Sequence, residues 1–172
     1  MRPDYCVVNN VITKENCDLL IEWSAKNSTR AKVHRPGLDL LKRRSAVAWI
    51  PNGSEFQEII EEILKAFCHV SESMFNHSVD SIEPIQLATY GIGDHYGWHM
   101  DAGLTGEDRV ISASVELDDP SSFKGGGLEF QTHPVPIPEK QQGRMIMFPS
   151  MLVHRARPIY WGKRRSLVIW AK

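Results

Sequence analysis

The spacing of hydrophobic residues changes near residue 80, from a helical period to the shorter alternation that is typical of strands. One helix is predicted in ITKENCDLLIEWSAKNS, where Thr13 is suited to the N-cap and Cys17, Leu20 and Ile21 fall along one side. A second helix is predicted from Ser54 to about Met74. Its apolar positions are Phe56, Ile59, Ile60, Ile63, Leu64 and Phe67.

Two local signals refine this first half. Ser54 and Gln57 form the S-x-x-Q pattern of a capping box at the start of the second helix. Between the helices, RSAVAWI (44–50) has the composition of a strand.

After residue 80, short apolar segments alternate with Gly, Pro and Asp, which predicts a series of strands. The predicted strands cover residues 82–90, 95–100, 109–117, 127–131, 144–149, 151–157 and 165–171. In 109–117 the apolar Ile111, Ala113 and Val115 alternate with Ser112, Ser114 and Glu116. That strand therefore has one apolar face and one polar face.

This order of elements predicts an α+β fold with a double-stranded β-helix (jelly-roll) core and N-terminal helices packed on the outside of one sheet. The 172 residues suit a single domain. Residues 1–80 would give mainly helical support, and residues 81–172 would form the jelly-roll core.

Composition and charge narrow the function. A formal net charge of −1 gives no sign of a nucleic-acid partner or a membrane surface. Three widely spaced cysteines favour a reducing compartment over a disulfide framework. No signal peptide and no membrane-spanning segment is recognisable, so a cytoplasmic location is expected. The sequence says nothing about oligomeric state.

The segment GDHYGWHMDAG (93–103) carries the first candidate chemistry. His99 and Asp101 are two residues apart, so in an extended chain both side chains lie on one face and can bind a cation together. His154, at the start of a later strand, is the candidate third ligand. Two imidazoles and one carboxylate form the facial triad of non-haem iron(II) oxygenases, which leaves coordination positions open.

Arg164 adds a second feature, because it follows His154 by ten residues at the start of the last strand. Its guanidinium can grip a carboxylate with two N–H groups, and Ser166 on the same strand face adds a hydroxyl. Arg165 is adjacent, but strand alternation allows only one of the two arginines to point inward.

These residues and their flanking blocks resemble the Fe(II)- and 2-oxoglutarate-dependent dioxygenases, specifically the prolyl-4-hydroxylase-like branch with its PKHD-type hydroxylases. The matching blocks are YGIGDHYGWHMDA, ASVELDDP followed by GGGLEF, and FPSMLVHRARPIYWGKRRSLVIW, and they cover most of residues 80–172. Gly127 departs from the pattern, because the family more often has an acidic or polar residue there.

The resemblance implies a role for each matched residue. His99, Asp101 and His154 would bind the iron, and Arg164 would pair with the far carboxylate of 2-oxoglutarate. Tyr90 would face this co-substrate, with help from Ser166. The implied cofactors are Fe(II), 2-oxoglutarate and O2, with ascorbate as a further candidate.

The implied reaction hydroxylates an unactivated C–H bond while 2-oxoglutarate is decarboxylated to succinate and CO2. A prolyl residue in a peptide or protein is the first expected substrate, and a small molecule is the second. Residues 31–43 and 102–109 are the segments expected to select it. The alternative is a jelly-roll metal protein without oxygenase activity, such as a cupin-type isomerase or a ligand-binding module.

Overall fold

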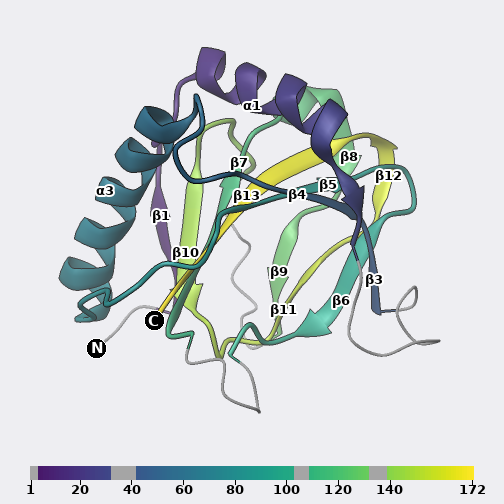
Figure 1. Ribbon diagram of the computed structural model, residues 1–172. Coiled ribbons are helices and arrows are strands. Elements are labelled where there is room, and N and C mark those ends of the chain that lie inside the picture. The colour runs from purple at the N-terminus through teal and green to yellow at the C-terminus, as the bar shows by residue number, and fades with distance from the viewer. Residues whose placement is uncertain (1–3, 32–41, 103–108, 132–138) are drawn as a thin grey trace.

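Two antiparallel sheets form the core of the protein, and two helices cover the outside of the larger sheet (Figure 1). The computed structural model describes residues 4–31, 42–102, 109–131 and 139–172. The segments 31–43 and 102–109, expected to select the substrate, lie for the most part outside these described residues.

The larger sheet has seven strands, in the order β1 (Cys6–Val8), β10 (Met145–Pro149), β7 (Ile111–Glu116), β13 (Arg164–Ala171), β5 (Gln86–Tyr90), β4 (Ala46–Trp49) and β2 (Thr29–Arg30). The smaller sheet has the order β3 (Arg43–Arg44), β6 (His95–His99), β11 (His154–Ala156) and β9 (Leu128–Phe130). The strands β12 (Ile159–Gly162) and β8 (Phe123–Gly125) pair with each other in a two-stranded sheet. A short 3-10 turn, Pro120–Ser122, precedes β8. The α+β jelly roll predicted from the sequence is confirmed.

Both predicted helices are present, but only one has the predicted cap. The helix α1 (Lys14–Asn27) begins after Thr13, whose hydroxyl accepts a hydrogen bond from the Asn16 amide. The helix α3 (Gln57–Phe75) begins three residues later than predicted, with Phe56 at its N-cap. The predicted capping box was therefore wrong. Ser54 lies in a turn before the helix, where its carbonyl oxygen accepts a hydrogen bond from the Gln57 amide.

The hydrophobic core lies between these helices and one face of the larger sheet. Alternate residues of its central strands point toward the helices and are almost completely buried. The cluster includes Cys17 and Leu20 of α1, Ile60, Ile63 and Phe67 of α3, and Leu87, Ala113, Val115, Met145, Met147, Leu167 and Ile169 of the sheet.

The opposite face of the same sheet is polar and turned inward. Its buried polar residues include Ser112 and Glu116 on β7 and Ser166 on β13. The alternation in the sequence of β7 predicted a polar face, but it did not predict that this face is buried. The smaller sheet covers this face, and Ser166 of β13 and Ser114 of β7 line a cavity between the two sheets. The larger sheet is therefore buried on both faces. One face packs in the apolar core, and the other faces the polar site.

The first 80 residues contribute more strands than the sequence predicted. Only the strand at 44–50 was expected, whereas β1, β2 and β3 also pair with the sheets. Among the described residues, neither helix has the length and apolar character required for crossing a bilayer.

Candidate metal centre

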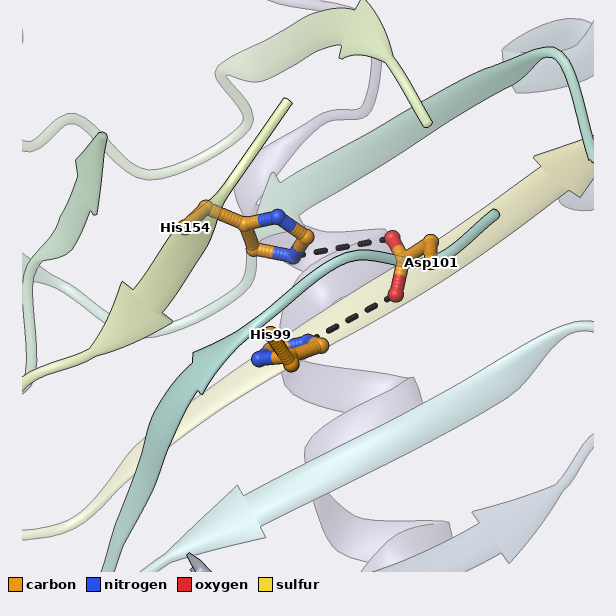
Figure 2. A group of neighbouring side chains, drawn as sticks. All are labelled: His99, Asp101 and His154. Atoms are coloured by element: carbon orange, nitrogen blue, oxygen red, sulfur yellow. Dashed lines mark ion pairs between the residues drawn. The ribbon is translucent and has the colours of Figure 1, made fainter. Parts of the chain in front are cut away.

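Three ionisable side chains meet where the smaller sheet faces the larger one. His99 is the last residue of β6, Asp101 follows two residues later, and His154 opens β11. The antiparallel register pairs His99 directly with His154, so both imidazoles leave adjacent strands at the same level. Figure 2 shows the two rings and the carboxylate converging on one point.

The distances suit a shared cation. Asp101 Oδ1 lies 3.5 Å from His99 Nε2, and Asp101 Oδ2 lies 3.6 Å from His154 Nε2. One ligand atom from each residue lies within 4.8 Å of the other two. All three side chains are at least nine-tenths buried.

Backbone hydrogen bonds fix which nitrogen each ring presents. His99 Nδ1 lies 2.8 Å from the Gly97 carbonyl oxygen, and His154 Nδ1 lies 2.8 Å from the Leu152 carbonyl oxygen. Because a carbonyl oxygen can only accept, each Nδ1 donates its proton, and in the neutral ring Nε2 then carries the lone pair. Ligating histidines are oriented in this way in metal sites.

Aromatic packing holds the two rings in place. Tyr96 stacks on His99, with ring centroids 3.5 Å apart and an interplanar angle of 13°. Phe148 packs edge-on against His154 at 4.7 Å. Burial raises the pKa of the Tyr96 phenol to about 12, so Tyr96 is neutral at physiological pH.

The protonation states also suit a metal. Burial acts to raise the pKa of the Asp101 carboxyl, but hydrogen bonding and charge from the two histidines outweigh it, and the pKa lies well below its ordinary value. Burial lowers the pKa of His154. Both shifts favour the deprotonated forms that bind metals.

One buried oxygen atom of Asp101 lacks a hydrogen-bond partner in the described part of the chain, which also indicates a bound cation. Asp101 Oδ2 is buried and has no hydrogen-bond partner among the described residues. A buried carboxylate oxygen without a partner is costly, and a cation bound between the three side chains would satisfy it. Two neutral imidazoles and one carboxylate are the donor set of a non-haem Fe(II) site. The residues therefore fit iron.

The six residues predicted to bind the metal or the co-substrate line one cavity. Its volume is about 60 Å³, and its walls include His99, Asp101, His154, Tyr90, Arg164 and Ser166. The two arginines separate as strand alternation predicted. Arg164 is buried in the cavity wall, whereas Arg165 is partly exposed and its Nη1 lies 2.7 Å from Asp118 Oδ1.

Close packing of a glycine turn against Ile159 and Arg164 supports this arrangement. Gly126 has φ +68°, and a Cβ there would lie 2.3 Å from Ile159 Cδ1 and 3.0 Å from Arg164 Cδ. A side chain at this position would be strained at the positive φ and would displace the end of the Ile159 side chain.

Sequence reasoning missed two residues of the site. Tyr96, which stacks on His99, was read only as one aromatic of a crowded segment. Glu116 forms an ion pair with Arg164, with Glu116 Oε2 at 2.9 Å from Arg164 Nε. The alternation of Ser112, Ser114 and Glu116 could have indicated Glu116, because it places these three side chains on one face of β7.

A buried two-histidine, one-carboxylate cluster inside a double-stranded β-helix defines the class: a jelly-roll protein with the three-ligand site of a non-haem iron oxygenase. The family model described as the 2OG-Fe(II) oxygenase superfamily matches residues 85–172. The chain belongs to this superfamily, and its cofactors are Fe(II), 2-oxoglutarate and O2.

Curated relatives agree with this family. A PKHD-type hydroxylase of Hyphomonas neptunium is 30% identical over 127 residues, which cover 69% of this chain and 54% of the relative. One from Thermosynechococcus vestitus is 28% identical over 134 residues, covering 72% of this chain and 58% of the relative. The matched part of this chain thus spans little more than half the length of these relatives.

Solved structures share the fold along nearly the whole chain. A viral collagen prolyl hydroxylase from Paramecium Bursaria Chlorella virus-1, in complex with 2OG, aligns with a TM-score of 0.75 and 25% identity over 98% of this chain and 96% of its own. A prolyl hydroxylase of Trichoplax adhaerens, in complex with a hypoxia inducible factor peptide fragment, aligns with a TM-score of 0.76 and 17% identity over 98% and 83%.

Proposed function

We propose that this chain is an Fe(II)- and 2-oxoglutarate-dependent dioxygenase that hydroxylates an unactivated C–H bond. The observation that carries the proposal is one cavity lined by His99, Asp101 and His154 together with Arg164. In this assignment the two Nε2 atoms and the Asp101 carboxylate hold the iron. Fe(II) at this point would couple decarboxylation of 2-oxoglutarate, to succinate and CO2, with insertion of one oxygen atom of O2 into the substrate.

The side chains around the triad bind and orient 2-oxoglutarate. Arg164 binds the far carboxylate of 2-oxoglutarate through its guanidinium, since planar N–H pairs match a carboxylate. Ser166 offers a hydroxyl on the same strand face, and Tyr90 lies in the same wall, paired in register with Arg164. The buried walls exclude water from the metal, which protects the reaction from unproductive side chemistry.

A prolyl residue in a peptide or protein is the proposed substrate. This finer assignment is supported by the names of the relatives, among which one prolyl hydroxylase is bound to a peptide fragment. Two exposed aromatics, Trp98 and Trp161, suit a surface that contacts an extended chain. Residues 1–172 would act as one domain, with the chemistry in 81–172. Use of ascorbate and a cytoplasmic location remain predictions.

One observation favours the alternative, a jelly-roll metal protein without oxygenase activity. Arg164 already has a carboxylate partner in Glu116, so its charge does not by itself require an incoming acid. A cupin-type isomerase or a binding module would use the metal and leave 2-oxoglutarate unconsumed. Turnover of 2-oxoglutarate therefore separates the two functions.

The test is succinate formation by the purified chain with Fe(II), 2-oxoglutarate, O2 and a library of proline-containing peptides. The wild type should form succinate and add the mass of one oxygen to a peptide. His99→Ala removes a metal ligand and should lower turnover by at least about a hundredfold, the upper end of what loss of a ligand-supporting contact costs.

The matched control is His69→Ala, which removes an exposed histidine of α3 and should leave turnover unchanged. Metal binding by the wild type without any 2-oxoglutarate consumption would favour the non-oxygenase alternative. Succinate formation with peptide mass unchanged would keep the activity and reject the peptide substrate.

A further inference from the structure

Arg164 is held by a buried carboxylate of the protein itself. Glu116 lies on β7, next to β13, and its Oε2 atom is 2.9 Å from Arg164 Nε. The side chains are only 6% exposed for Arg164 and 11% for Glu116. The guanidinium assigned to the co-substrate is thus partly neutralised before any ligand arrives.

The pair leaves part of the guanidinium available. Arginine has five N–H donors, and Glu116 engages the one on Nε. The terminal Nη2 has Ser114 Oγ at 3.5 Å, the outer limit of a hydrogen bond. An incoming carboxylate can therefore still bind the terminal nitrogens, but it does so beside a second buried negative charge.

A second cation, Lys140, lies near the pair. Lys140, Glu116 and Arg164 line a larger cavity of about 390 Å³, which shares Ser114, Leu128 and Arg164 with the cavity of the triad. Lys140 Nζ donates to the Gly125 carbonyl oxygen and lies 4.5 Å from the centroid of the Phe123 ring.

Burial lowers the pKa of Lys140, and the negative charge of Glu116 acts against that fall. Within the described part of the chain, no carboxylate lies in salt-bridge contact with Lys140. Its side chain passes Gly127, where a Cβ would lie 3.7 Å from Lys140 Cε, an ordinary van der Waals contact. The formal charges of Glu116, Arg164 and Lys140 leave one positive charge for an incoming acid. Those of Glu139 and Arg144, which line the same cavity, cancel.

We infer that Glu116 sets the affinity of the co-substrate site: it holds the Arg164 side chain through Nε and weakens the attraction for the far carboxylate, while Lys140 supplies the balancing charge. This inference rests on the proposed function and names a residue that tunes it. Like charges a few ångströms apart in a partly desolvated site repel each other by ~1 kcal/mol or more. Burial raises the pKa of Glu116, and the positive charge of Arg164 acts against that rise and favours the charged carboxylate.

The test compares 2-oxoglutarate with 2-oxopentanoate, which has the same five-carbon chain with a methyl group in place of the far carboxylate. Binding to the Mn(II)-loaded protein is measured by calorimetry, so that no turnover is needed. Glu116→Gln keeps an oxygen that can accept from Arg164 Nε and removes the negative charge. It should lower the Kd for 2-oxoglutarate about tenfold and leave the Kd for 2-oxopentanoate unchanged.

Lys140→Met tests the other charge and does not depend on a buried substitution. It should raise the Kd for 2-oxoglutarate about tenfold, again without an effect on 2-oxopentanoate. Glu129→Gln is the matched control, because it removes a carboxylate that pairs with Arg155 on the smaller sheet. Its two Kd values should equal those of the wild type.

The outcomes separate this inference from the proposed function. A wild type that binds Mn(II) but no 2-oxoglutarate would reject the proposed function itself. If the wild type binds and Arg164→Ala weakens binding, the co-substrate site stands. An unchanged 2-oxoglutarate Kd in Glu116→Gln, or equal shifts for both acids, would then overturn the role of Glu116 alone. Should Glu116→Gln not fold, an unchanged Kd in Lys140→Met overturns the charge balance.

Discussion

At the scale of single residues, the metal centre depends on neighbours that do not bind the metal. Carbonyl oxygens of Gly97 and Leu152 choose the tautomer of the two histidines, and the ring of Tyr96 lies flat on His99. A ligand that is fixed before the metal binds loses less conformational entropy when the metal arrives. Tyr96 should therefore contribute to metal affinity through its ring.

Tyr96→Ala should weaken Mn(II) binding about tenfold, the lower end of the range for residues that support a ligand. Tyr96→Phe keeps the stacked ring and should bind Mn(II) as the wild type does, because the hydroxyl makes no hydrogen bond within the described residues. Calorimetric titration with Mn(II) measures both. Equal weakening in the two variants would assign the effect to the hydroxyl instead of the ring.

The sequence predicted the ligand residues better than their surroundings, for a physical reason. His99 and Asp101 are two residues apart, so local geometry alone puts them on one face. Glu116 lies on a strand whose alternation is visible, but nothing in one strand tells what covers its polar face. That face meets Arg164 only because β7 and β13 pair in the folded sheet.

At the scale of elements, the two helices differ at their N-termini: α1 has a side-chain cap and α3 has none. Thr13 accepts from the Asn16 amide, whereas Ser54 lies in a turn before α3 and gives that helix no side-chain cap. The motif at Ser54 was right in composition and wrong in geometry, because Pro51 and Gly53 place the chain in a turn. Strands such as β2 and β3 were missed because two residues show no period.

Thr13→Ala should lower the free energy of unfolding by about 1 kcal/mol, the usual cost of losing an N-cap. Ser54→Ala should change it by less than about 0.5 kcal/mol, since only a long contact of 3.4 Å from the Phe56 amide is lost. Urea unfolding at equilibrium compares the two. A larger loss for Ser54→Ala would mean that the turn before α3 stabilises the protein more than the cap of α1.

At the scale of the whole molecule, one sheet joins the apolar core to the metal centre. Val115 of β7 faces the helices while its neighbours Ser114 and Glu116 face the cavities. The helices therefore support the site from behind, although none of their residues lines the triad cavity. Opening of the core should accordingly involve the sheet and the helices together, as one cooperative unit.

The buried thiol of Cys17 can report such opening. Cys17 is fully buried on α1, and burial raises its pKa to about 12, so in the folded state it should not react with a thiol reagent at neutral pH. Phe67→Ala, in the same cluster on α3, should cost ~3–5 kcal/mol and speed Cys17 labelling at least a hundredfold. Met74→Ala, at an exposed position of the same helix, should leave the rate unchanged.

Mass spectrometry of a variant with Cys6 and Cys68 replaced by serine isolates the signal from Cys17. If labelling requires opening of the whole unit, the logarithm of its rate must rise in proportion to the lost stability, because each 1.4 kcal/mol changes the open population about tenfold. If Phe67→Ala lowers stability while the Cys17 rate stays that of the wild type, α1 separates from the sheet on its own. The helices would then be an independent covering layer, and the metal centre would not depend on them.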